Sequence, residues 1–184
     1  MRHIIGKVSF ALLIAWQNAT KTRSMKKTPP SRPLDEFDKA ILRLVQRDNR
    51  MPQRQIADRV HLSAAAVQRR IASMEKAGII VANSAEVDVH AVNMSITAIV
   101  EITMKDERLE TVDNAKALFR AAPEVQQCYY VTGGTSFLLV IVTQDVMTYE
   151  DITRRLFATN ESVESYRSLI ALDRVKTGST ITIP

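Results

Sequence analysis

The chain has 184 residues, of which 46% are hydrophobic and 24% charged, a composition typical of a soluble globular protein with one or two small domains. Its single cysteine, Cys128, excludes an intramolecular disulfide and fits a reducing cytosol, where we interpret it as a small core residue. The net charge of +5 is unevenly distributed along the chain. Residues 34–83 hold nine Lys/Arg and six Asp/Glu, whereas residues 84–184 hold nine Lys/Arg and fourteen Asp/Glu. This asymmetry is expected when one domain meets a polyanion and the other does not.

Residues 1–33 contain seven Lys/Arg and no acid, and we expect them to form a disordered basic tail. The apolar run at residues 4–16 is interrupted by Lys7 and is too short to span a bilayer. No small-x-small cleavage motif precedes the next basic residues, and Met25 could begin a shorter protein. We therefore interpret residues 1–24 as a start-site extension without a folded role; an export signal is the alternative.

Three helices are predicted between residues 34 and 83. Asp35 is an N-cap for the first helix, which we expect to end near Asp48 and Asn49. A short second helix is expected from Pro52 or Gln53 to Val60. The third begins after the N-cap Ser63 and runs to about Ala77, where Gly78 stops it. Its apolar stripe consists of Val67, Ile71 and Met74.

Only His61, Leu62 and Ser63 join the second and third helices, which predicts a helix-turn-helix whose second helix enters the major groove of DNA. Small side chains at the start of that helix let it approach the duplex closely. Gln pairs with adenine, and Arg with guanine or phosphate. The candidate DNA-contacting residues are Arg50, Gln53, Arg54, Ser63, Ala64, Ala65, Gln68, Arg69 and Arg70. The alternative is a three-helix domain with a solvated basic face.

After a linker at residues 84–94, the pattern changes to strands and helices over residues 95–184. Strands are expected at 95–104, 124–131, 136–143 and 163–173, and helices at 108–122 and 145–159. The order β-α-β-β-α-β is that of a ferredoxin-like domain, so the fold class is α+β.

Three segments together resemble the leucine-responsive/asparagine regulator (Lrp/AsnC) family of transcription factors: LDEFDKAILRLVQRDNR (34–50), IADRVHLSAAAVQRRIASMEKAGII (56–80) and PEVQQCYYVTGG…FLLVIV (123–142). The resemblance implies an N-terminal winged helix-turn-helix that binds double-stranded DNA. It also implies a C-terminal ferredoxin-like domain that dimerises, assembles further and binds an amino acid or a related small metabolite.

The resemblance implies an effector site at the turn between the two middle strands, with candidate residues Thr132, Gly133, Gly134, Thr135 and Ser136. The family commonly has Gly, an acidic residue, any residue and Asp at this turn, whereas this chain has Gly-Gly-Thr-Ser. The acid that would pair with a ligand ammonium group is therefore absent from the turn, although its backbone N–H groups suit a carboxylate. A plain β-hairpin turn is the alternative interpretation.

We therefore expect a cytoplasmic, homo-oligomeric, sequence-specific transcriptional regulator without a cofactor, metal site or membrane partner. A sequence-tolerant nucleoid-organising protein is the alternative. A second alternative is an enzyme similar to tetrapyrrole decarboxylases, which have the same architecture. None of the three histidines, His3, His61 and His90, lies in the expected C-terminal domain, and no Cys/His pair has ligand spacing, which argues against an enzyme.

Overall fold

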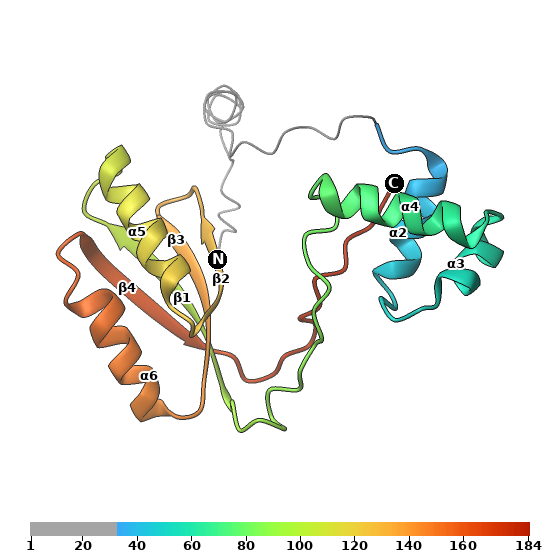
Figure 1. Ribbon diagram of the computed structural model, residues 1–184. Helices are drawn as coiled ribbons and strands as arrows, with labels where there is room; N and C mark the ends of the chain where they lie inside the picture. Colours follow the sequence, from blue (N-terminus) through green and yellow to red (C-terminus); the bar gives the residue numbers. More distant parts are fainter. Residues whose placement is uncertain (1–32) are drawn as a thin grey trace, which may run out of the picture. The chain divides into compact units, whose positions relative to one another are not determined.

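The computed structural model describes residues 33–184, and the chain divides into two compact units (Figure 1). Of the described residues, the first unit contains 33–84 together with 179–184, and the second contains 85–178. The expectations for residues 1–24, and for all but the last residue of the basic tail, lie outside this range. Within the described range, no helix is long and apolar enough to cross a membrane.

The first unit consists of three helices, α2 (Glu36–Val45), α3 (Gln53–Val60) and α4 (Ala64–Lys76). They form because each has one apolar face, and these faces meet in a small core of Ile41, Leu42, Ile56, Ala57, Val60, Val67 and Met74. At the start of α2, the carboxylate of Asp35 accepts from the backbone N–H of Asp38, and that of Asp38 accepts from the N–H of Asp35. This reciprocal capping box anchors the helix and confirms Asp35 as its N-cap.

The predicted helix ends are confirmed for α3 and α4 but not for α2. His61 adopts φ 55°, a left-handed conformation that ends α3, and Gly78 adopts φ 67° just after α4. The first helix ends at Val45 rather than near Asp48 and Asn49. The N–H groups of Arg47 and Asp48 both donate to the carbonyl of Leu44, so the chain leaves the helix through a tight turn.

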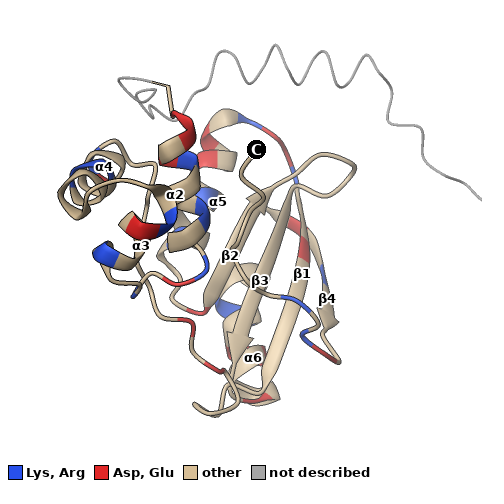
Figure 2. Cartoon of the chain, turned by 90° about the vertical axis from the view of Figure 1, so that its right-hand side faces the viewer, with Lys and Arg blue, Asp and Glu red and all other residues tan. Residues whose placement is uncertain are grey.

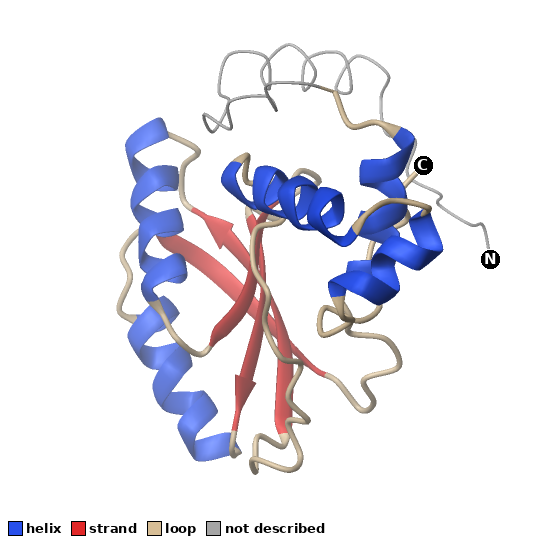
Figure 3. Ribbon diagram, turned by 45° about the vertical axis from the view of Figure 1, so that its right-hand side comes forward, coloured by secondary structure: helices blue, strands red, loops and turns tan. Residues whose placement is uncertain are grey.

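The second unit is a four-stranded antiparallel sheet in the order β2-β3-β1-β4, with its helices on one face (Figure 3). In chain order its elements are β1 (Ile96–Met104), α5 (Leu109–Ala121), β2 (Val125–Tyr130), β3 (Phe137–Thr143), α6 (Val146–Thr153), the π-helical turn η1 (Arg154–Ala158) and β4 (Val163–Ile170). This confirms the α+β class and the ferredoxin-like domain. Three phenylalanines, Phe119, Phe137 and Phe157, lie at the centre of the core between sheet and helices.

The helices cover only one face of the sheet. Burial alternates along β1, whose residues Ala98, Val100, Ile102 and Met104 are buried against the helices. The strand pairing therefore places a second set of side chains on the other face: Ile99, Glu101, Tyr129, Leu138, Val140, Arg167 and Leu169. This open face mixes these apolar side chains with polar ones, Thr97, Thr103, Gln127 and Ser165, and carries an ion pair, Arg167 to Glu101 at 2.6 Å. Cys128 is exposed on the edge strand β2, so its interpretation as a core residue was wrong.

The C-terminal residues 179–184 group with the helical unit, whereas we expected the second domain to extend to residue 184. The Arg43 guanidinium on α2 donates to the carbonyls of Ile183 and Pro184 at 3.2 and 2.9 Å. The Gln46 side chain exchanges two hydrogen bonds with the backbone of Ile181, at 3.0 and 3.2 Å. Ile183 also packs against the helical core, so the end of the chain completes the first unit.

Candidate nucleic-acid interface and ligand site

One face of α4 is exposed and carries small and hydrogen-bonding side chains. Ser63 caps the helix, because its hydroxyl oxygen accepts from the backbone N–H of Ala66 at 3.2 Å. The predicted contact residues Ser63, Ala64, Ala65, Gln68 and Arg69 are all exposed. This face continues through Ala72, Ser73 and Lys76, which our sequence reasoning missed. Ala72 and Ser73 lie four residues after Gln68 and Arg69, respectively, and Lys76 lies one further turn along the helix.

The other predicted contact residues lie around the start of α3. Arg50, Gln53 and Arg54 are exposed there, and Figure 2 shows Lys/Arg positions on both α3 and α4. Among the residues that the structure describes, the guanidinium groups of Arg50, Arg54 and Arg69 make no hydrogen bond or ion pair within the chain. They are available to phosphate oxygens.

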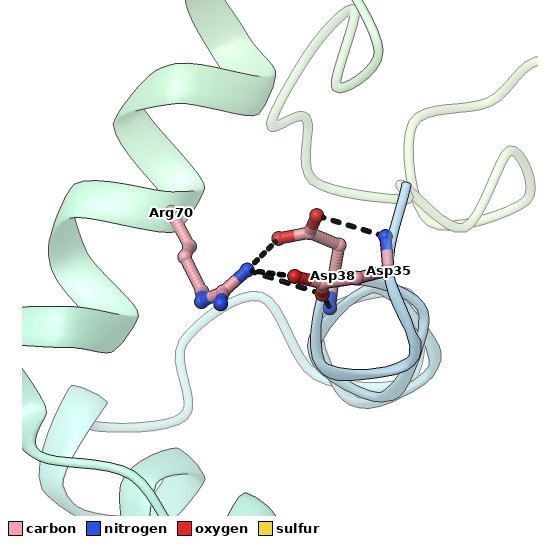
Figure 4. A network of polar contacts seen from close by, with 3 residues as sticks. All are labelled: Asp35, Asp38 and Arg70. Atoms are coloured by element: carbon pink, nitrogen blue, oxygen red, sulfur yellow. Dashed lines mark hydrogen bonds and ion pairs between the residues drawn. The ribbon is translucent and has the colours of Figure 1, made fainter. Parts of the chain in front are cut away.

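Arg70 differs from these arginines, because its guanidinium turns toward α2 (Figure 4). Its Nη1 lies 2.8 Å from a carboxylate oxygen of Asp35 and 2.8 Å from one of Asp38. The same guanidinium lies 5.5 Å from the ring centroid of Phe37, a cation–π contact. The hydrogen bonds that Arg70 donates to Asp38, and secondly to Asp35, raise the pKa of Arg70 above its ordinary value.

The expectation that Arg70 lies on the exposed side of α4 was therefore wrong. Asp38 is 0% exposed, and a buried carboxylate requires a partner, which Arg70 supplies from the facing helix. Arg70 links α4 to the capping box of α2 and thereby holds α4 in place. Phe37 on α2 is 43% exposed and lies beside this guanidinium.

The predicted ligand turn connects β2 to β3. Gly133 and Gly134 have φ values of 113° and 93°, which favour glycine, and a Cβ built on either would meet nothing within 4 Å. Thr132 and both glycines are exposed. The N–H groups of Gly133, Gly134 and Thr135 donate to no backbone carbonyl among the described residues. The turn therefore presents three successive backbone donors to its surroundings.

Ser136 is turned inward and is 4% exposed. Its hydroxyl oxygen accepts from the N–H of Met104 at 3.1 Å, and the hydroxyl donates to Oε1 of Glu107 at 2.6 Å. Ser136 is a candidate effector-binding residue by sequence, but its hydroxyl group is buried and already bonded to Met104 and Glu107. Our sequence reasoning missed Glu107, because it lies 29 residues earlier in the chain and no local pattern connects the two positions.

Two family models match this chain. One described as winged helix-turn-helix DNA-binding matches residues 34–81, and one described as Lrp/AsnC ligand binding domain matches residues 97–181. An uncharacterized HTH-type transcriptional regulator of Sinorhizobium fredii is 37% identical over 151 residues, which cover 82% of this chain and 88% of that protein. The leucine-responsive regulatory protein of Salmonella typhimurium is 26% identical over 157 residues, covering 85% and 96%.

Solved structures have the same fold. An AsnC family transcriptional regulator from Agrobacterium tumefaciens matches with a TM-score of 0.75 and 28% identity, covering 81% of this chain and 97% of that one. A transcriptional regulator from Neisseria meningitidis, solved in complex with L-Met, matches with a TM-score of 0.75 and 25% identity, covering 82% and 97%.

Proposed function

The chain belongs to the Lrp/AsnC family of transcriptional regulators, and we propose that it binds double-stranded DNA sequence-specifically through α4. The observation that carries this proposal is the exposed face of α4, where small side chains surround Gln68 and Arg69. Small side chains let a helix enter the major groove, in which Gln and Arg read base edges. Arg50 and Arg54 would contact the phosphate backbone and set the position of the helix.

We further propose that the protein is a cytoplasmic homo-oligomer. Its sheet has an open face on which Ile99, Leu138, Val140 and Leu169 lie together, and a second copy of the chain is the partner that would bury them. A two-fold dimer presents two copies of α4, so its DNA site would be approximately palindromic. Residues 34–83, completed by 179–184, would form the DNA-binding unit, and residues 84–94 would lead into the effector and oligomerisation domain.

We propose that an amino acid or a related small metabolite regulates this assembly by binding at the turn of residues 132–136. The match to a family ligand-binding domain supports this, as does the relative solved with L-Met. An effector acts by binding one conformational or assembly state better than another. The free backbone donors of Gly133, Gly134 and Thr135 offer a place for its carboxylate.

Binding-site selection on the purified full-length protein tests the DNA assignment. Random duplexes should yield a palindromic consensus, bound on the order of a thousandfold or more tightly than unrelated DNA at the same physiological salt concentration. Enrichment of no consensus, with equal affinity for all duplexes, would instead support a sequence-tolerant nucleoid protein and contradict the proposal.

A further inference from the structure

The loop between β1 and α5 brings a carboxylate to the glycine turn. Glu107 Oε1 accepts from the Ser136 hydroxyl at 2.6 Å, and Oε2 accepts from the Tyr130 hydroxyl at 2.5 Å. Tyr130 ends β2 and Ser136 immediately precedes β3, so the two hydroxyls hold the carboxylate from both sides of the turn. Glu107 is nevertheless exposed. A carboxylate has about four acceptor positions, so each of its oxygens can accept a further hydrogen bond.

An aromatic ring beside this carboxylate already attracts an ammonium group. Lys116 Nζ lies 4.6 Å from the centroid of the Tyr130 ring, whose hydroxyl donates to Glu107. The face of a tyrosine ring and a nearby carboxylate both attract a positively charged group. The surroundings of Glu107 are therefore suited to a primary ammonium ion.

The adjacent turn offers the complementary chemistry. The N–H groups of Gly133, Gly134 and Thr135 donate to no backbone carbonyl of the described residues, and the space around a Cβ built on either glycine is open. Successive N–H groups in such a turn bind anions. A fixed carboxylate next to free N–H donors matches the two charged ends of an α-amino acid.

We propose that Glu107 is the ammonium-binding residue of an α-amino acid site whose carboxylate subsite is the turn of residues 133–135. This inference rests on the proposed effector function and names a specificity-determining residue for it. The negative charge that the turn sequence lacks comes from the loop before α5. The site therefore selects amino acids over acids of the same shape without an ammonium group.

Calorimetry on the full-length protein tests the assignment. The twenty standard amino acids are titrated into the wild type, and the tightest binder is compared with the 2-hydroxy acid that has the same side chain. Glu107→Gln retains the size of the side chain and one acceptor oxygen, places an NH2 group opposite the second hydroxyl, and removes the charge. It should weaken binding of the amino acid at least tenfold and change binding of the hydroxy acid less than twofold. Glu110→Gln, at an exposed position in the first turn of α5, is the matched control and should bind as the wild type does.

Three results would overturn the inference. Unchanged amino acid affinity in Glu107→Gln would show that another group binds the ammonium, and the proposed effector function would stand. If Glu107→Gln weakened binding of the amino acid and of the hydroxy acid equally, Glu107 would support the shape of the site without binding the ammonium group. If no amino acid binds the wild type, both this inference and the proposal of an amino acid effector are wrong. The DNA-binding proposal is unaffected, because binding-site selection tests it separately.

Discussion

Arg69 and Arg70 are neighbours in the sequence, but their guanidinium groups have different surroundings. Arg69 is exposed on the proposed DNA-binding face of α4, whereas Arg70 pairs with Asp35 and the fully buried Asp38 on α2. Consecutive helical positions point about 100° apart, so one position separates a side chain that meets solvent from one that meets the neighbouring helix. The two arginines therefore support different measurable properties of the protein.

Arg69→Ala should weaken binding to the selected DNA site at least tenfold, about 1.4 kcal/mol, because it removes a base or phosphate contact. The stability of the helical unit should not change, since the Arg69 side chain makes no polar contact within the described residues. Gel-shift titration at a fixed salt concentration measures the first quantity and native-state hydrogen exchange of α2 amides measures the second. Unchanged affinity would exclude Arg69 from the interface.

Arg70→Ala should destabilise the helical unit by about 3 kcal/mol, because it leaves the buried carboxylate of Asp38 without its cationic partner. Hydrogen exchange of α2 and α4 amides should report this loss, with Arg69→Ala as the matched control from the adjacent position. If both variants were equally stable, the ion pairs seen in the structure would contribute nothing to folding.

At the scale of elements, the last residues of the chain stabilise a helix that lies more than 130 positions earlier. The backbone of Ile181, Ile183 and Pro184 hydrogen-bonds to Arg43 of α2 and to Gln46, which caps its end, and the Ile183 side chain packs on the helical core. A three-helix unit has little apolar surface to bury, so each added side chain matters. The chain thus leaves the helical unit after Ser84 and returns to it at Ser179, which connects the two units twice.

Ending the chain at Gly178 should lower the free energy of unfolding of the helical unit by about 1–2 kcal/mol. This variant loses the partly buried Ile183 side chain and the hydrogen bonds from the tail to Arg43 and Gln46. Ile183→Ala should reproduce part of this loss in the full-length chain. Ile181→Ala is the control, because the Ile181 side chain is 70% exposed and binds through its backbone. Hydrogen exchange of α2 amides measures all three variants, and equal protection in each would contradict the role of the tail.

At the scale of the whole molecule, one layer of helices on a four-stranded sheet leaves the second face of the sheet uncovered. Tyr129 is 51% exposed and Leu169 is 44% exposed, both on a face that also carries Ile99, Leu138 and Val140. Apolar side chains gathered on an uncovered sheet face, with polar ones around them, are typical of a protein–protein interface. We propose that two chains bury it together and so place their two α4 helices on one DNA site.

Leu169→Asp should convert the full-length protein from a dimer or larger assembly into monomers, because it puts a charge among the apolar side chains of the proposed interface. Sedimentation velocity measures the assembly. Leu172→Asp is a matched control, because Leu172 is fully exposed just beyond β4. Affinity for a palindromic site should also fall in Leu169→Asp, since its two half-sites would then be bound independently. A wild-type monomer would contradict the proposal, as would a Leu169→Asp protein that assembles normally.

The sequence by itself determined the features that depend on local spacing. Apolar periodicity and end residues such as Asp35, Ser63 and Gly78 predicted the helices, and alternation predicted the strands and their ferredoxin-like order. Local patterns succeed here because capping, turn conformation and amphipathic burial act within a few residues. The exposed contact face of α4 could be predicted for the same reason, including positions such as Ala72 and Ser73 that we did not name.

Only the tertiary structure decided which polar side chains pair across the chain. Arg70 belongs to the fold because Asp38 lies opposite it on α2, and Glu107 reaches the glycine turn because β1 and β3 are paired neighbours in the sheet. The tail joins α2 because Ile183 meets an apolar surface there. Such contacts depend on how elements that are distant in the sequence pack together. The local sequence pattern does not indicate which of these elements lie close in space.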